Sequence, residues 1–317
     1  MTTQPSILIS GSVAYDRIMD YRGKFVDSLL PDQLHQINVS FLVDDIKENF
    51  GGTAGNIAYN LALLEERSTI LATAGKDFLP YKTWMEQHGI DASKIIIKQD
   101  KPTGAAYIMT DQGNNQIAAF HLGAMATPFP PLNAIVPQKI KYAIIAPGNI
   151  FDMVAFSRFY HERNIPYLFD PGQNIPALSG DDLRTCINGA RALIANDYEM
   201  RLIEEKTGWN HDDVLSAVNI LVTTLGEKGS RIETKKEAFE IPAAQCSVVK
   251  DPTGAGDAYR AGFLKGLLHK LPLDQCGKLG SVVAAYTVEQ YGTQTHNPTF
   301  QEIQERFKTN FGSMLVL

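Results

Sequence analysis

The sequence predicts an α/β protein in which helices cover both faces of a mostly parallel sheet. Between residues 141 and 224, short apolar runs typical of strands alternate with segments of helical spacing, and such alternation requires crossover connections between parallel strands. Two glycine-rich turns, at 51–56 and 254–257, lie beside helical patterns. Two segments without a helical period, near 39–43 and 103–120, predict a small additional β layer.

Composition indicates a globular protein and argues against nucleic acid as a partner, while a small anionic cosubstrate can still bind. The 317 residues are 44% hydrophobic, which is ample for a substantial core, and the net charge is −6. Without a long run of Lys or Arg, a nucleic-acid-binding surface is not expected. The N-terminus does not resemble a signal peptide and no stretch approaches membrane-spanning length, so we expect a cytoplasmic location. Three widely spaced cysteines fit neither a disulfide framework nor a metal site, and we expect buried thiols at Cys186, Cys246 and Cys276.

The first strand is expected at residues 7–10, and the turn residues Gly11 and Ser12 follow it. Asp16 lies just beyond this turn. Ligands of open α/β sheets bind outside the carboxyl ends of strands, so the Asp16 carboxylate could accept hydrogen bonds from substrate hydroxyl groups. A turn-forming Asp on the surface is the alternative, and position alone favours it.

A glycine turn then opens a helix at about residue 57. Gly51 and Gly52 would allow the backbone to approach a ligand closely, and Asn56 offers both a donor and an acceptor. The turn lacks the full G-x-G-x-x-G spacing of a dinucleotide fold, so by itself it is a weak signal. A core strand at 69–74 and a short helix at 82–88 are expected next.

The β-only segments are expected to form a lid. Val39, Phe41 and Val43 alternate as in a strand with one exposed face, while 103–110 and 117–120 flank a polar turn typical of a hairpin. We expect a single domain, 1–317, whose lid is discontinuous and covers approximately 15–48 and 100–122.

Three later strands end in polar groups, at 170–173, 196–199 and 224–230. For each segment alone, a structural turn is the better explanation, because Asp, Asn and Gly dominate turns. Asn196 and Glu199 could instead order the waters around Mg²⁺, which prefers oxygen ligands and keeps much of its hydration shell.

The stretch at 250–257 combines Thr253, two glycines and a carboxylate ahead of a helical pattern. We expect a strand at 246–249, a glycine turn and a helix with Asp257 at its N-cap. The free backbone N–H groups at such a helix start suit a phosphate, or the charge that develops in phosphoryl transfer. The helix terminus should also favour the ionised form of Asp257. Simple helix capping is the alternative.

Other enzyme classes lack their signatures here. The sequence contains no G-x-x-x-x-G-K-[ST] loop, no G-x-S-x-G elbow and no H-E-x-x-H pair. The first strand is not followed by a dinucleotide fingerprint.

Four of these segments resemble, in order, the motifs of the ribokinase-like (PfkB) carbohydrate and nucleoside kinases. The segment 51–56 is similar to the family's G-G-x-x-x-N motif, 196–199 to N-x-x-E, 224–229 to T-x-G-x-x-G and 251–257 to D-T-x-G-A-G-D. The resemblance covers essentially the whole chain. It implies a three-layer α/β/α sandwich with a small β lid, and transfer of the ATP γ-phosphoryl group to a sugar hydroxyl.

The resemblance also implies roles for residues. Asp257 would be the catalytic base, with the anion hole at Gly254, Ala255 and Gly256; Gly51, Gly52 and Asn56 would contact the sugar; Asn196 and Glu199 would order Mg²⁺; and Thr224, Gly226 and Gly229 would lie along ATP. Asp251 and Thr253 match part of a monovalent-cation site, usually for potassium. Pro252 and His296 depart from the family pattern there, which puts potassium dependence in doubt.

Within the family, residues 251–263, 169–173 and 114–116 look most similar to the prokaryotic nucleoside and adenosine kinases. Flat apolar side chains would hold the base and amides would read its edge; the candidates are Phe41, Tyr107, Phe120, Asn115, Gln116 and Gln173. Arg260 would hold substrate or phosphate charge, so its loss should affect substrate use more than stability.

A free-sugar kinase such as a ribokinase is the alternative function. A catalytically silent sensor is a distant one, because a sensor has no need of Asp257. The chain is expected to be a monomer or a homodimer through the lid.

Overall fold

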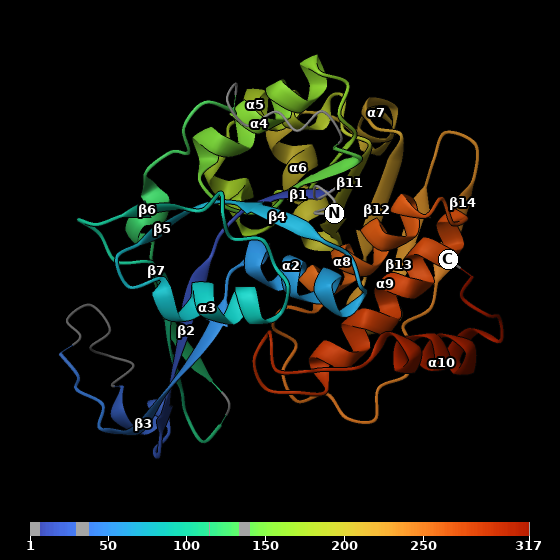
Figure 1. The fold of residues 1–317 in the computed structure, drawn as a ribbon. Coiled ribbons are helices and arrows are strands. Elements are labelled where there is room, and N and C mark those ends of the chain that lie inside the picture. The colour runs from blue at the N-terminus through green and yellow to red at the C-terminus, as the bar shows by residue number, and fades with distance from the viewer. Residues whose placement is uncertain (1–6, 30–37, 114, 133–139, 317) are drawn as a thin grey trace.

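The computed structural model describes residues 7–29, 38–113, 115–132 and 140–316. Within this part of the chain an eight-stranded sheet forms the centre (Figure 1). Its strands, in spatial order, are β14 (Ala238–Ile241), β13 (Ser230–Glu233), β12 (Ile220–Thr224), β11 (Ala192–Asn196), β10 (Tyr167–Phe169), β9 (Tyr142–Ile145), β1 (Ile7–Ser10) and β4 (Ser68–Leu71). The strands from β12 to β4 are parallel, and β13 and β14 add an antiparallel edge.

Helices cover both faces of this sheet. One layer contains α2 (Thr53–Leu63), α8 (Ala255–Leu268), α9 (Leu273–Val288) and α10 (Phe300–Phe311). The other contains α4 (Ile150–Glu162), α5 (Gly180–Ile187), α6 (Asp197–Thr207) and α7 (His211–Ala217). The expected three-layer α/β/α sandwich is confirmed. Among the described residues, no helix combines the length and apolar character needed to cross a bilayer.

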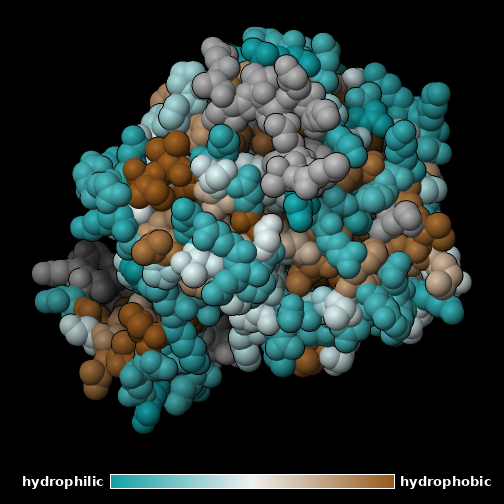
Figure 2. All heavy atoms as spheres, viewed as in Figure 1, coloured by the Kyte–Doolittle hydropathy of each residue, from teal (hydrophilic) through white to brown (hydrophobic). Residues whose placement is uncertain are grey.

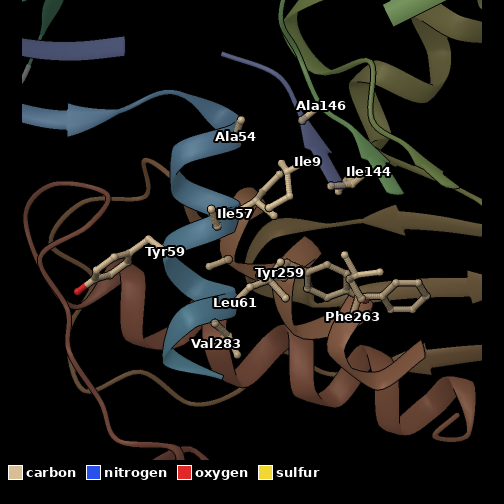
Figure 3. Close-up of a cluster of buried hydrophobic side chains, with 14 of the residues drawn as sticks. Ile9, Ala54, Ile57, Tyr59, Leu61, Ile144, Ala146, Tyr259, Phe263 and Val283 are labelled. Atoms are coloured by element: carbon tan, nitrogen blue, oxygen red, sulfur yellow. The ribbon is translucent and has the colours of Figure 1, made fainter. Parts of the chain in front are cut away.

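The alternation of side chains along each strand produces two separate cores. Ile7 and Ile9 of β1 pack in the core beneath α2 and α8, whereas Leu8 packs in the core beneath α4 and α5. Figure 3 shows the first core, where Ile57 of α2 lies among Ile9 of the sheet and Tyr259 of α8. A strand that is buried on both faces has a continuous apolar run in its sequence, which is why the short apolar runs predicted core strands.

A second sheet of four strands projects from the sandwich, at the lower left of Figure 1. Its order is β3 (Val43–Gly51), β2 (Ala14–Tyr21), β7 (Gly104–Thr110) and β8 (Gln116–His121). The strand near Val39 is therefore longer and later than expected. Phe41 precedes it and packs on Tyr21 and on Phe25 of α1 (Phe25–Ser28), with ring centroids 5.0 and 5.2 Å apart. Hydrophobic side chains gather at this end in Figure 2, where Val26 and Leu42 are exposed.

Two other expected elements differ in the structure. The strand at 69–74 is divided into β4 and β5 (Thr73–Gly75), which pairs with β6 (Ile96–Lys98), and the helix expected at 82–88 is α3 (Leu79–Gln87). The prediction of a strand at 246–249 was wrong, since Val248 and Val249 are exposed and pair with no strand of the described sheets. The next two residues instead donate their backbone N–H groups to Val288 O at the end of α9, so this segment is held by a helix rather than by a strand.

Candidate active site

The two glycine turns meet at the starts of α2 and α8, which pack side by side. Asn56 in the first turn of α2 donates from Nδ2 to Oδ2 of Asp257 at 2.8 Å. Asp257 is the third residue of α8, and the N-cap is Gly254 with φ +79°. The expectation that Asp257 is the N-cap was therefore wrong. Its carboxylate faces α2 instead of closing its own helix.

Asp16 joins this pair from β2. A Cβ on Gly51 would lie 2.2 Å from Asp16 Oδ2, so only glycine leaves room for the carboxylate there. Gly52, with φ +85°, begins α2. Gly51 and Gly52 thus place Asp16 over the turn that carries Asn56, whereas the sequence had led us to expect only a close approach of this backbone to a ligand.

Burial dominates the electrostatics of these carboxylates. Burial raises the pKa of Asp257 to about 6, while the charge of Arg260 and the hydrogen bond from Asn56 oppose the shift. Burial likewise raises the pKa of Asp16 to about 6, and the charges of Asp257 and Asp251 add to the effect. The expectation that the helix start would favour ionised Asp257 was wrong, because desolvation outweighs it. A carboxyl group with such a pKa is suited to accept a proton near neutral pH.

Arg260 lies one turn further along α8 and forms a buried ion pair. Its Nη2 donates to Asp170 Oδ1 at 2.7 Å, and its Nε lies against the other carboxylate oxygen. Both side chains are buried, and burial raises the pKa of Asp170 to about 7 while Arg260 opposes this. A Cβ on Gly256 would come within 2.7 Å of Arg260 Nη1, so the guanidinium lies beside the first turn of α8.

A cavity of about 560 Å³ opens on the other side of that turn. It brings together the residues expected along ATP and two of the three expected in the anion hole, namely Thr224, Gly226, Gly229, Ala255 and Gly256, whereas Gly254 is not among its lining residues. Its apolar part was missed in the sequence, although small residues repeat at helical spacing in α9; this part includes Val249, Ala284, Ala285 and Val288. Cys246 also lines the cavity and is exposed, whereas Cys186 and Cys276 are buried as expected.

Asn196 and Glu199 form the capping box of α6. The Asn196 N–H donates to Glu199 Oε2 and the Glu199 N–H donates to Asn196 Oδ1, each at 2.8 Å. Within the described residues no group of three or more His, Cys, Asp or Glu side chains could hold a metal ion alone. This arrangement fits a hydrated Mg²⁺ on ATP oxygens, because that ion needs few protein ligands and Glu199 Oε1 is outside the capping box.

Asp251 ties the anion-hole loop to the segment after α9. Its Oδ1 accepts the N–H of Thr253 at 2.9 Å, and its Oδ2 accepts the N–H of Gly292 at 3.0 Å. His296 lies deeper in the same segment, where burial lowers its pKa to about 4. A neutral imidazole therefore stands where the family resemblance led us to expect a small hydroxyl residue.

Two of the expected amide residues, Gln116 and Asn115, lie at the end of the β7–β8 hairpin away from Asp257. Gly104 of β7 pairs with Ala14, at the end of β2 nearest the sandwich. Gln116 pairs with Thr110 at the other end of β7, roughly 20 Å along the strand. Asn115 donates from Nδ2 to both oxygens of Asp111 and so stabilises the hairpin turn; Asn114 lies outside the described residues. Gln173 is exposed after β10.

Strand register also separates the expected aromatic side chains. Phe120 shares the sheet face of Asp16, because Ala106 pairs with both. Tyr107 lies on the opposite face, where its hydroxyl accepts a hydrogen bond from Arg17 at 2.6 Å. Side chains alternate between faces, so this difference depends on a pairing that one sequence does not reveal.

Three side chains next to Asn56 were missed. Gln294 donates to Asn56 Oδ1 at 3.0 Å and also contacts Tyr81 and Trp84. More than 200 residues separate Gln294 from each of them. Neither motif nor periodicity carries a signal for such contacts.

Comparison with known proteins identifies the class. The model for the pfkB family of carbohydrate kinases matches residues 10–300, and the chain belongs to this family. It is therefore a phosphotransferase that acts on an alcohol group of its substrate. The resemblance seen in the sequence motifs is confirmed.

Individual proteins that are similar to this chain have more specific names than the family. The nucleoside kinase of Methanocaldococcus jannaschii is 34% identical over 276 residues, covering 86% of this chain and 89% of the relative. The structure of Burkholderia thailandensis nucleoside kinase in complex with inosine matches with a TM-score of 0.88 and 38% identity, covering 98% of this chain and 100% of the other. Arabidopsis thaliana ribokinase, complexed with ribose and ATP, shares the fold at a TM-score of 0.79 and 17% identity, over 96% and 99% of the two chains.

Proposed function

We propose that this chain is a nucleoside kinase that transfers the γ-phosphoryl group of ATP to the 5′-hydroxyl of a ribonucleoside. The observation that carries the proposal is the position of Asp257. Asp257 lies in the first turn of α8, and the two residues before it, Ala255 and Gly256, line the 560 Å³ cavity. Its carboxylate faces Asn56, and its charge raises the pKa of Asp16. Similarity to nucleoside kinases from two organisms supports the same assignment.

In this proposal each side of the first turn of α8 holds one substrate. ATP occupies the cavity, with its phosphates toward Ala255 and Gly256, and the ribose lies toward Asp16 and Asn56. The backbone N–H groups of the anion hole, Gly254 to Gly256, then meet the charge that develops on the transferred group. Asp257 accepts the proton of the attacking hydroxyl. Alignment and charge stabilisation are the main demands of phosphoryl transfer.

The remaining polar residues have supporting roles. Arg260 adds positive charge beneath the anion hole while it is paired with Asp170. Asn196 and Glu199 would hold Mg²⁺ through water, and that ion would supply neutralisation of phosphate charge. Asp251 and Thr253 are our proposed monovalent-cation residues; a comparison of rates in potassium and tetramethylammonium buffers tests this role. A kinase of this kind works where ATP is made, so we place it in the cytoplasm.

The face of the four-stranded sheet that carries Asp16 supports a nucleoside over a free sugar. Ile18 and Ile108 pair side by side on this face, next to Ala106 and Phe120. These side chains offer an apolar surface for a base beyond the ribose site. We propose that this sheet, approximately 15–48 and 100–122, is the lid of the single domain 1–317.

The opposite face of the same sheet supports a homodimer. Ile46, Met19, Met109 and Ile117 form one apolar row across all four strands, and Ile46 and Ile117 are 55% and 43% exposed. We propose that two copies pair through this row, which leaves the Asp16 face free for substrate.

The test is a panel of acceptors with Mg·ATP and coupled detection of ADP. Inosine and adenosine are expected to give kcat/KM at least about a hundredfold above that for ribose, because the apolar lid contacts need a base. Efficient phosphorylation of ribose with none of any nucleoside would assign the chain to the free-sugar kinases. Binding without turnover of any acceptor would instead indicate a sensor.

A further inference from the structure

A chain of hydrogen bonds leads from Trp84 of α3 to Asp257. Trp84 Nε1 donates to Gln294 Oε1 at 3.2 Å, Gln294 Nε2 donates to Asn56 Oδ1 at 3.0 Å, and Asn56 Nδ2 donates to Asp257 Oδ2 at 2.8 Å. Gln294 is buried at 4% exposure and Asn56 at 5%. Solvent has little access to the two amides that link the indole to the carboxylate.

Two neighbours of Gln294 fix the direction of these hydrogen bonds, because one of them can only donate to Gln294 and the other can only accept from it. An indole N–H donates and cannot accept, so the oxygen of Gln294 must face Trp84. The Tyr81 hydroxyl donates its proton to Gly51 O at 2.9 Å, so it accepts from the nitrogen of Gln294. Both neighbours therefore demand the same amide orientation. Gln294 then presents an N–H to Asn56, and Asn56 must present its own N–H to Asp257.

We propose that Trp84 and Gln294 are positioning residues of the phosphoryl-transfer reaction, which keep the Asn56 amide turned so that an N–H always meets Asp257. This inference rests on the proposed role of Asp257 as the base. The bond occupies Oδ2 and leaves Oδ1 for the hydroxyl of the substrate. With the amide reversed, the oxygen of Asn56 would face the carboxylate and disfavour its ionised form.

The surroundings of Asp257 explain why a fixed donor matters. Asp16 from β2 and Asp251 from the anion-hole loop carry like charge, and Asp170 lies beyond Arg260, with Glu199 of α6 close enough to raise the pKa of Asp170. Arg260 and the Asn56 N–H are the groups that oppose burial and lower the pKa of Asp257. Arg260 is shared with Asp170, whereas the N–H of Asn56 is directed to Asp257 alone.

The experiment is the pH dependence of kcat/KM for a nucleoside, which reports the essential base of the free enzyme. Trp84→Phe keeps the aromatic ring but removes the donor, and Gln294→Met keeps the length of the side chain but removes the amide. Gln294→Met is expected to move the acid limb upward by about one pH unit, the value of one charge-assisted hydrogen bond. Trp84→Phe should move it in the same direction but by less, because Tyr81 still accepts from the Gln294 nitrogen. At pH values well above the limb, kcat/KM should return close to that of the wild type.

Two further variants sharpen the result. The double variant should shift the limb no more than Gln294→Met alone, because Trp84 acts only through the Gln294 amide. Trp209→Phe is the matched control, since the second tryptophan lies between α6 and α7, away from Asn56. It should leave the limb unmoved.

An unmoved limb in folded Trp84→Phe and Gln294→Met would overturn the proposal, as would an equal loss of kcat/KM at every pH. If Trp84→Phe does not fold, Gln294→Met decides alone. Failure of the kinase assignment would give a different experimental result. In that case the wild type phosphorylates no nucleoside, or Asp257→Asn retains the wild-type profile.

Discussion

At Asp257, two opposing effects act on one carboxyl group. The start of α8 favours the charged form, and burial favours the neutral form strongly enough to place the pKa near 6. An acid in this range is mostly ionised at neutral pH yet remains basic enough to take a proton. We therefore expect kcat/KM to decline below about pH 6 as Asp257 becomes protonated.

Asp257→Asn should lower kcat by on the order of a hundredfold or more, because only the proton acceptor is lost. The Asn side chain can still accept the hydrogen bond from Asn56, so the fold should be retained. Steady-state rates and thermal unfolding of the same preparation check both parts. Near-normal turnover in this variant would exclude Asp257 as the base.

Arg260 has a structural role that its sequence position did not reveal. The sequence led us to expect that loss of Arg260 would spare stability, but both it and Asp170 are buried. Arg260→Ala should lower the free energy of unfolding by about 3–5 kcal/mol, because a buried carboxylate is left without its partner.

Chemical denaturation measures this effect, and the double variant Arg260→Ala/Asp170→Asn is its control. The double variant should recover part of the lost stability, because it removes the unpaired charge. No loss of stability in the single variant would mean that the ion pair is dispensable for folding.

Among the secondary-structure elements, the four-stranded sheet is the one expected to respond to substrate. It projects from the sandwich with two edge strands and little core of its own, so it should close only on a ligand that fills the site. A purine nucleoside should slow amide hydrogen exchange in β2, β3, β7 and β8. Ribose at equal occupancy should protect mainly the region around Asp16 and Gly51. Hydrogen-exchange mass spectrometry checks this, and equal protection by ribose would contradict a base contact with the lid.

Comparison of elements with expectation shows what one sequence can predict. β1, β9, β11 and β12 were predicted from apolar runs, and the turns at Gly52 and Gly254 from residues that tolerate positive φ. These signals are local. The segment 246–249 has the composition of a strand, but pairing decides strands, and no described neighbour is available to it.

In the candidate site, too, short motifs were informative, whereas contacts between residues far apart in the sequence were not predictable. Motif spacing selected Asp257, Asn56, Gly256 and Thr224, and the structure brings these residues together around the start of α8. The contacts of Gln294, the sheet face of Tyr107 and the distance of Gln116 all depend on register or on pairs far apart in the chain. A single sequence holds no signal for these.

The whole molecule should be a dimer if the apolar row of Ile46, Met19, Met109 and Ile117 is its interface. Ile117→Lys would place a charge in that contact, on the edge strand β8, and should yield monomers. Light scattering coupled to gel filtration measures the mass, and turnover should persist because Asp16 lies on the other face. Met314→Lys is a control, since Met314 is 62% exposed and far from this sheet in sequence. A wild type that is already monomeric would refute the interface.

The joining of Asn56 to Asp257 also has a consequence for synthesis on the ribosome. α2 is made early, but its buried face packs against α8, which leaves the ribosome about 200 residues later. At translation speeds of roughly 5–20 residues per second, α2 waits some ten seconds or more for its partner. During that time Ile57 and Leu61 lack the α8 side chains that pack on them in the folded protein, so we expect chaperones to bind the nascent chain. If Asp257 is the base and 254–256 the anion hole, as proposed, no chain that ends before α8 can transfer phosphate from ATP by this site.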